Sequence, residues 1–484
     1  MIYPFPVLIL VVVLLAGCVS TRPGYIIPQT EEPSPTPEIT LTPYPTRPAF
    51  EPGTLVEYTA QSGDTLDALA ARFNCTVDEI RKANTFIPDD VTTLPPGMPM
   101  KMPIYYRPLW GMDFQIIPDS AFVYGPATRG FNAVSYINSS VGWFKYYSAY
   151  SMGRQLSAAE LIVWIAENYS ISPKVLLALI EYQKQALTTM QRDEASEEIW
   201  LGFDDTSYYG VYLQISYAAN LLNHGFYLYR EGRLTSFEHL DGRIENPDPW
   251  QNAATVALQY YFSRLFDGDI YRKAISPEGY YKTYTQLFGD PWADDEPAIP
   301  GTLTQPELRL PFAKGQTWAY TGGPHTGWGN LSPWSAIDFA PPASIGGCTP
   351  SDLFAVAVAD GIVARTGPGI VVLDLDGDGD ERTGWVIFYL HIAEKDRVIK
   401  GTMVKAGDAI GHPSCEGGRS TGTHIHIARK FNGEWISADG IIPFNLDGWV
   451  AKNGALPYSG FMVKDNWTVR ANPNPDSSSF ITAK

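Results

Sequence analysis

The chain has few basic residues, few histidines and few cysteines. Its 484 residues hold 35 Lys and Arg against 52 Asp and Glu, so the formal net charge is −17 at pH 7. This charge argues against nucleic acid, or an anionic membrane surface, as a partner bound by charge. The hydrophobic share is 45%, which is enough for ordinary cores. The length allows about three domains.

The first 52 residues predict a targeting segment and a tether. The apolar run at residues 7–16 is too short to span a bilayer comfortably. It leads into Leu15-Ala16-Gly17-Cys18, which resembles a bacterial lipobox. The resemblance implies a lipoprotein signal at residues 1–18 and membrane attachment through a lipid on Cys18. No Lys or Arg precedes the run, which departs from the usual pattern and indicates a misassigned start codon or an unusual signal. An uncleaved anchor is the alternative to a lipoprotein signal. The Pro- and Thr-rich residues 19–52 predict an extended linker.

The scarce histidines are clustered near the C-terminus. The chain has seven, and five of them lie between residues 325 and 426. Two occur in Thr423-His424-Ile425-His426-Ile427. In a strand, alternate side chains share a face, so His424 and His426 point one way and the isoleucines point into a core. Such a pair either takes part in a metal site or is an exposed polar pair.

Other residues nearby are suited to complete a metal site. His325 lies in a Gly/Pro-rich loop, and Asp338 follows 13 residues later in a second alternating strand. His391 ends an apolar run at residues 385–390 that predicts a buried strand. Two imidazoles and one carboxylate form a hydrolytic zinc set whose fourth position is left to water. Zinc lowers the pKa of that water, and further histidines can act as a base and stabilise an oxyanion.

Residues 305–450 resemble the lysostaphin/LytM-type zinc endopeptidases, through four separated motifs that occur in the family's order. The long interval from His325 to Asp338 is similar to that of the beta-lytic branch. The resemblance implies a mainly antiparallel β domain that cuts peptide bonds in peptidoglycan stems or cross-bridges. It implies an active-site groove walled by the loops at 322–333 and 415–421. It also implies that zinc is bound by His325, Asp338 and His426, and that His391 and His424 are the catalytic pair.

Residues 55–104 predict a small module of two strands and two helices. Gly63-Asp64-Thr65-Leu66 opens a helix that continues to Phe73, and Thr76-Val77-Asp78-Glu79 forms a capping box for a second helix. The module resembles a LysM domain along its whole length. That resemblance implies binding to the N-acetylglucosamine-containing glycan of peptidoglycan or chitin.

Residues 105–300 predict a mainly helical domain. Helical periodicity appears at 158–168 and 175–182. Three fragments resemble soluble lytic transglycosylases, which have a lysozyme fold. In that family the acid would stand at the position of Gln183, and an amide cannot protonate a glycosidic oxygen. The resemblance therefore implies a degenerate lysozyme-like domain. Glu181 is interpreted as a solvated or capping carboxylate.

An acidic loop in the C-terminal domain has the carboxylate spacing that opens a calcium site. Trp385 stands where the twelfth ligand of a complete loop would be. An acidic hairpin turn is the alternative to calcium binding. The four carboxylates are Asp374, Asp376, Asp378 and Asp380.

Two cysteines flank the proposed metal site. In an extracytoplasmic compartment a bridge between Cys348 and Cys415 would tie together two loops beside it, and two free buried thiols are the alternative. Cys75 lies in the LysM-like helices, and His412 matches no motif position and is interpreted as a loop histidine.

The sequence thus predicts a multidomain, lipid-anchored cell-envelope protein that acts on peptidoglycan and ends in an extension at 451–484. A second class of protein has to be weighed. Some envelope lipoproteins with LysM and LytM-type domains lack zinc ligands and activate amidases. The complete ligand set of this chain favours the enzyme. A protein that only binds the cell wall is a third possibility.

Overall fold

The computed structural model describes residues 50–484, apart from 106, 108–110, 193–196 and 343–345. The predicted lipid attachment at Cys18 and most of the predicted linker lie outside these residues. All described residues fall within one contact-defined unit, 44–484. Within the described part, no helix is both long and apolar enough to cross a membrane.

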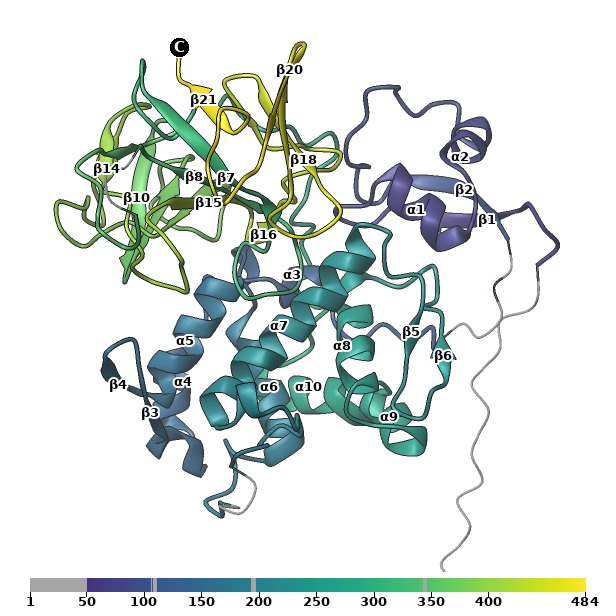
Figure 1. Ribbon diagram of the computed structural model, residues 1–484. Coiled ribbons are helices and arrows are strands. Elements are labelled where there is room, and N and C mark those ends of the chain that lie inside the picture. Colours follow the sequence, from purple (N-terminus) through teal and green to yellow (C-terminus); the bar gives the residue numbers. More distant parts are fainter. Residues whose placement is uncertain (1–49, 106, 108–110, 193–196, 343–345) are drawn as a thin grey trace, which may run out of the picture. The chain divides into compact units, whose positions relative to one another are not determined.

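The N-terminal module has the order strand, helix, helix, strand (Figure 1): β1 Thr54–Thr59, α1 Leu66–Phe73, α2 Val77–Ala83 and β2 Pro99–Ile104. The strands pair antiparallel. Thr65 caps α1, and the predicted capping box of Thr76 and Glu79 is present on α2. These caps satisfy helix-terminal N–H groups that would otherwise lack partners.

The middle of the chain, residues 119–288, is a bundle of helices that we call the helical region. Its elements are α3 Asp119–Phe122, η1 Pro126–Thr128, α4 Ala133–Ser139, η2 Trp143–Tyr146, β3 Ser148–Ser151, β4 Arg154–Ser157, α5 Ala158–Tyr169, α6 Pro173–Lys184, η4 Thr206–Tyr208, α7 Val211–Arg230, β5 Phe237–Glu238, β6 Ile244–Glu245, α8 Ala253–Ser263, α9 Gly268–Ala274, η5 Pro277–Tyr281 and α10 Lys282–Phe288.

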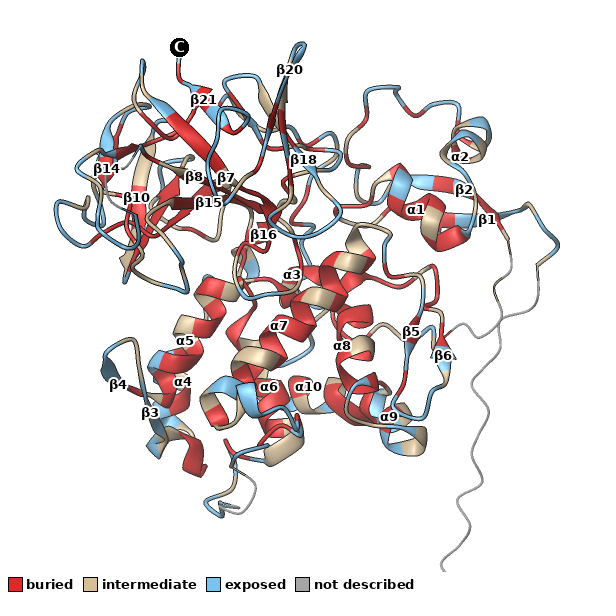
Figure 2. Ribbon diagram, in the orientation of Figure 1, coloured by how far each residue is buried: buried red, intermediate tan, exposed pale blue. Residues whose placement is uncertain are grey.

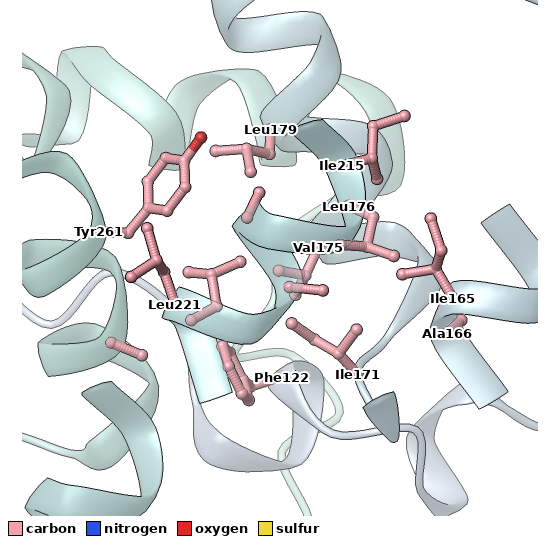
Figure 3. Close-up of a cluster of buried hydrophobic side chains, with 14 of the residues drawn as sticks. Phe122, Ile165, Ala166, Ile171, Val175, Leu176, Leu179, Ile215, Leu221 and Tyr261 are labelled. Carbon is pink, nitrogen blue, oxygen red and sulfur yellow. The ribbon is translucent and has the colours of Figure 1, made fainter. Parts of the chain in front are cut away.

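Helix α6 lies at the centre of this bundle. Leu176 and Leu179 are buried among side chains from α5, α7 and α8, including Ile165, Ile215 and Tyr261 (Figure 3). Helices α7 and α8 come close together because α7 carries a glycine at the contact. A Cβ on Gly225 would lie 3.0 Å from the backbone of α8.

The C-terminal region is built on an antiparallel sheet, which positions the candidate site. The strands are β7 Thr317–His325, β8 Ala336–Ala340, β9 Ala355–Val356, β10 Gly361–Gly367, β11 Ile370–Asp374, β12 Trp385–Leu390, β13 Met403–Val404, β14 Ala409–Gly411, β15 Ile425–Phe431, β16 Glu434–Trp435, β17 Asn445–Leu446, β18 Trp449–Asn453, β19 Gly460–Lys464, β20 Trp467–Arg470 and β21 Phe480–Thr482. Nine of them form one sheet in the order β13-β10-β11-β12-β15-β8-β7-β21, with β16 paired to β15.

The central strands of this sheet are covered on both faces. Strands β8, β12 and β15 are almost entirely buried, as Figure 2 shows for β15. The last strand, β21, pairs with β7, so residues near the C-terminus belong to the same sheet as the candidate site.

A buried ion cluster joins the helical region to its neighbours. One Nη atom of Arg230 donates to Asp119 and to Glu434 of β16, each at 3.0 Å. The other Nη donates to the carbonyl of Ser62 in the N-terminal module. The guanidinium of Arg230 therefore pairs with two buried carboxylates from two regions. Burial raises the pKa of Glu434 to about 7.

Candidate metal centre

Three adjacent strands bring the predicted ligands together. His325 ends β7, Asp338 lies in the middle of β8, and His426 is the second residue of β15. Asp338 and His426 are directly opposite each other in the strand pairing. Each of the three residues offers a ligand atom, and these atoms lie within 4.8 Å of one another.

The two imidazoles of this group are oriented by backbone carbonyls. His325 Nδ1 donates to the carbonyl of Gly323 at 2.8 Å, and His426 Nε2 donates to that of Gly327 at 3.0 Å. The protons thus lie on the outward nitrogens. The inward nitrogens, His325 Nε2 and His426 Nδ1, are 2.9 Å apart, so two lone pairs converge. Such outer partners fix the tautomer of metal-ligating histidines.

The carboxylate completes a cation-binding set. Asp338 Oδ1 lies 3.4 Å from each inward nitrogen, and it is buried without a hydrogen-bond partner. Gly322 faces Asp338 across the β7–β8 pairing, and a Cβ there would lie 2.2 Å from Asp338 Oδ2. The glycine makes room for the carboxylate. An orphaned buried oxygen beside two converging lone pairs fits Zn²⁺, which takes nitrogen and oxygen ligands in such sets.

Burial and mutual charge control the ionisation of these groups. Burial lowers the pKa of His325 to about 4 and that of His391 to about 3. Both imidazoles are therefore neutral at neutral pH and have lone pairs available. Burial opposes the charge on Asp338, but the neighbouring imidazoles, His325 first, hold its pKa well below the usual range. An ionised carboxylate and neutral imidazoles are the forms that bind a metal.

The other two clustered histidines stand beside the ligand set. His391 follows β12, and its Nδ1 donates to the carbonyl of Glu416 at 2.8 Å. His424 Nδ1 donates to the carbonyl of Gly422 at 2.8 Å. The two rings are 4.4 Å apart, and His424 Nε2 lies 3.9 Å from Asp338. His391 has φ +67°, a left-handed conformation that costs energy in a non-glycine residue and is found at functional sites.

All five residues line one cleft of about 1420 Å³. Its walls include residues 325–330, which belong to the first predicted loop, and residues 417–424, of which 417–421 belong to the second. Tyr458 also lines it, and its ring stacks on His325 at 4.0 Å. No sequence motif includes Tyr458, which lies in the extension at 451–484.

The two cysteines flank this cleft as a disulfide. The structure joins Cys348 to Cys415, with their Cα atoms 5.4 Å apart. His412 is absent from the described lining of the cleft. It packs on Phe354 and hydrogen-bonds the carbonyl of Leu353.

The acidic loop lies away from the described lining of the cleft. The carboxylate of Asp374 is buried and accepts backbone N–H bonds from Asp376 and two glycines of the loop. Asp378 and Asp380 both pair with Arg129. Three of the carboxylates are close enough to share a cation, namely Asp374, Asp376 and Asp378. Calcium binding by this loop stays a prediction.

The residues singled out in the helical region have structural partners. Glu181 is buried and accepts from the backbone N–H of Leu187 at 2.8 Å and from the hydroxyl of Thr188. Gln183 accepts from Tyr261 at 2.8 Å and donates to the carbonyl of Leu201. Glu181 thus caps a turn in the interior.

Comparisons with known families agree with this architecture. Residues 58–103 match the model of the LysM domain, and residues 115–301 match that of the LasA N-terminal domain. No comparison confirms the lysozyme-like interpretation of the middle region, which stays a prediction. The chain therefore consists of a LysM domain, a helical domain of the LasA N-terminal type and an antiparallel β region.

One curated relative is protease LasA of Pseudomonas aeruginosa, strain UCBPP-PA14. It is 26% identical over 346 residues, which cover 66% of this chain and 75% of the relative. The chain is a homologue of that protease.

Two solved structures resemble parts of the chain. The metalloprotease pseudoalterin, from the deep sea, is 21% identical over 35% of this chain and 96% of its own, with a TM-score of 0.30. The catalytic domain of lysostaphin from Staphylococcus simulans is 23% identical over 25% of this chain and 89% of its own, with a TM-score of 0.18.

Proposed function

We propose that the C-terminal region is a zinc-dependent endopeptidase that hydrolyses peptide bonds of peptidoglycan stems or cross-bridges. The observation that carries this proposal is the convergence of His325, Asp338 and His426 beside His391 and His424 in one open cleft. A second support is the homology with protease LasA. A cleft of about 1420 Å³ has room for a peptide segment.

In this proposal the residues of the chain have separate roles. His325, Asp338 and His426 hold Zn²⁺, which when bound supplies Lewis acidity at the scissile carbonyl. His391 and His424 direct their outward protons to backbone carbonyls, so the Nε2 of each is left for substrate chemistry. One accepts a proton from the attacking water at its Nε2, and the other stabilises the tetrahedral oxyanion when its own Nε2 carries a proton.

Metal analysis and digestion of sacculi test the proposal together. The purified full chain should hold about one zinc ion at the three-ligand set. It should release peptides from sacculi that mass spectrometry identifies by the bond cut. His325→Ala and Asp338→Ala should abolish both zinc binding and release. Stoichiometric zinc in both variants would refute the ligand assignment, and zinc binding without release by the wild type would refute the enzyme.

The proposal also gives the glycan a place to bind. A groove of about 550 Å³ lies between the LysM residues 57–62 and the helical region, and it includes two half-buried indoles, Trp250 and Trp292. Flat aromatic rings suit the C–H faces of sugars. Gln61 and Gln115 also line this groove, and both donate to the carbonyl of Trp250.

A pair of matched substitutions tests this groove. Trp292→Ala should reduce co-sedimentation of the full chain with sacculi and its affinity for soluble N-acetylglucosamine oligomers. Trp467→Ala removes an indole that is 72% exposed on β20 and should change neither. Equal binding by both variants and the wild type would rule the groove out.

An amidase activator without peptidase activity is the alternative function. It predicts that the chain stimulates an amidase and that His391→Ala or His424→Ala leaves that stimulation intact. The complete ligand set favours the enzyme. Location at the cell wall follows from a peptidoglycan substrate, and the lipid on Cys18 is testable by mass spectrometry of the mature N-terminus.

A further inference from the structure

One wall of the cleft connects a metal ligand to the helical region. We call residues Thr326–Leu331 the cleft loop. Its Gly327 carbonyl accepts the proton of His426 Nε2 at 3.0 Å. Its residues 326–330 line the cleft. The cleft loop therefore orients the metal ligand His426 and also forms part of the surface that contacts substrate in the proposed function.

The opposite side of the cleft loop is held by helix α7. Asn330 makes a reciprocal pair of hydrogen bonds with Asn220: the Asn330 backbone N–H donates to Asn220 Oδ1 at 3.2 Å, and Asn220 Nδ2 donates to Asn330 Oδ1 at 2.5 Å. Asn330 Nδ2 also donates to the hydroxyl of Tyr208 at 3.0 Å. Asn220 is only 3% exposed, so its amide is fixed by its surroundings.

The loop and the helix fit closely. Gly329 has φ +92°, and a Cβ there would lie 2.4 Å from Asn220 Oδ1. Trp328 packs edge-on against Trp164 of α5, with the ring centroids 5.9 Å apart. Within the loop, Thr326 donates to the carbonyl of Leu331 at 2.6 Å. The loop thus closes on itself, and its side-chain hydrogen bonds to another region run through Asn330.

We infer that Asn220 is a positioning residue for the metal centre, and that the helical region acts through the cleft loop on His426. His426 can offer the Nδ1 lone pair inward only while its proton stays on Nε2, opposite the Gly327 carbonyl. If the cleft loop moves, neither the tautomer nor the ring orientation of His426 is fixed any longer. The inference rests on the proposed zinc site, and it makes the helical region part of the peptidase.

The test compares two buried asparagines of α7 in the full-length protein. Asn220→Ala removes the pair of hydrogen bonds to the cleft loop. Asn223→Ala is the matched control: Asn223 is 2% exposed and donates to the carbonyl of Tyr169 at 2.7 Å, within the helical region. Both variants lose buried amide hydrogen bonds, so loss of stability alone affects them alike.

The expected difference is in metal affinity and in the motion of the loop. Competition with a chelator should show Asn220→Ala binding Zn²⁺ about 10-fold more weakly, the lower end of the range for outer partners of ligands. Amide hydrogen exchange of residues 326–331 should become faster in Asn220→Ala. The Asn223→Ala variant should match the wild type in both measurements. Asn330→Ala should shift both measurements in the same direction, although its backbone N–H still reaches Asn220 Oδ1, and the double variant should fall short of the sum of the two single effects, because the side-chain bond between the two asparagines is lost in each.

The outcomes separate this inference from the proposed function. Wild-type zinc affinity and wild-type loop exchange in Asn220→Ala would overturn the inference. Equal zinc loss in Asn220→Ala and Asn223→Ala would also overturn it, since the cause would then be general instability. A wild type that binds no zinc refutes the proposed function instead, and the exchange of the cleft loop still reports whether Asn220 holds it.

Discussion

The buried carboxylate of Glu434 should make the protein less stable as the pH rises. Two carboxylates share the one guanidinium of Arg230. Asp119 Oδ1 also accepts from Asn252 and from the backbone N–H of Ala254. Glu434 is the group that takes the proton, because burial raises its pKa from 4.5 to about 7.

The sign and the size follow from the two pKa values. Between about pH 4.5 and pH 7 the folded protein binds a proton that the unfolded chain has released, so the free energy of unfolding falls as the pH rises. Below this range both states are protonated, and above it both are ionised. From pH 5 to pH 8 the loss is about 2.5 kcal/mol for this one group.

Urea denaturation of Glu434→Gln at pH 5 and pH 8 checks this. Gln keeps the shape and an oxygen for Arg230 but cannot ionise. The free energy of unfolding should fall between the two pH values by about 2.5 kcal/mol less in the variant than in the wild type. Glu307→Gln changes an exposed carboxylate and should keep the wild-type slope. Identical pH slopes in all three proteins would show that Glu434 is already ionised at pH 5.

Three further predictions concern the metal centre and its surroundings. His424→Ala should lower turnover about 10²–10⁴-fold and keep zinc, whereas His426→Ala should lose both zinc and turnover. Zinc and turnover assays would contradict these roles if His424→Ala lost its zinc or His426→Ala kept both. Gly322→Ala should weaken zinc binding in a chelator competition, because its Cβ would lie 2.2 Å from the facing carboxylate oxygen, and unchanged affinity would show that the carboxylate can shift freely. Replacing Cys348 and Cys415 by Ser should lower the free energy of unfolding by about 4 kcal/mol, because the bridge closes a sequence separation of 67 residues, and equal urea midpoints would show that it adds no stability.

Sequence reasoning works best where one local rule decides the outcome. Alternation along a strand predicts that His424 and His426 share a face, and both line the cleft while Ile425 is buried on the other side. Capping chemistry predicts the start of α2 at Thr76, as the structure has it. These inferences depend on residues within one turn or one strand, so no tertiary contact can change them easily.

The parts that sequence reasoning missed depend on partners far apart in the chain. The carbonyls that orient the histidines belong to Gly323, Gly327, Gly422 and Glu416. Every residue has a backbone carbonyl, so residue type cannot indicate which carbonyls take this role. Tyr458 reaches His325 only because the chain returns through the extension at 451–484. Gly322 does indicate the position of the Asp338 carboxylate, because a glycine directly opposite a carboxylate on the neighbouring strand leaves room for that side chain. This can be recognised only once the strand register is known.

The helical region changes how the metal centre has to be understood. The three ligands and the two flanking histidines come from the β region alone, which suggests an independent unit. Yet Asn220 holds the cleft loop, and Arg230 holds Glu434 on the strand paired with β15, the strand that carries His426. Two separate contacts from one helix, α7, therefore lead to the same ligand strand and its orienting carbonyl. A change in α7 can reach the metal ligand His426 through either of these two contacts. Cleaving or destabilising the helical region should therefore lower zinc affinity before it disrupts the strand pairing of the β sheet.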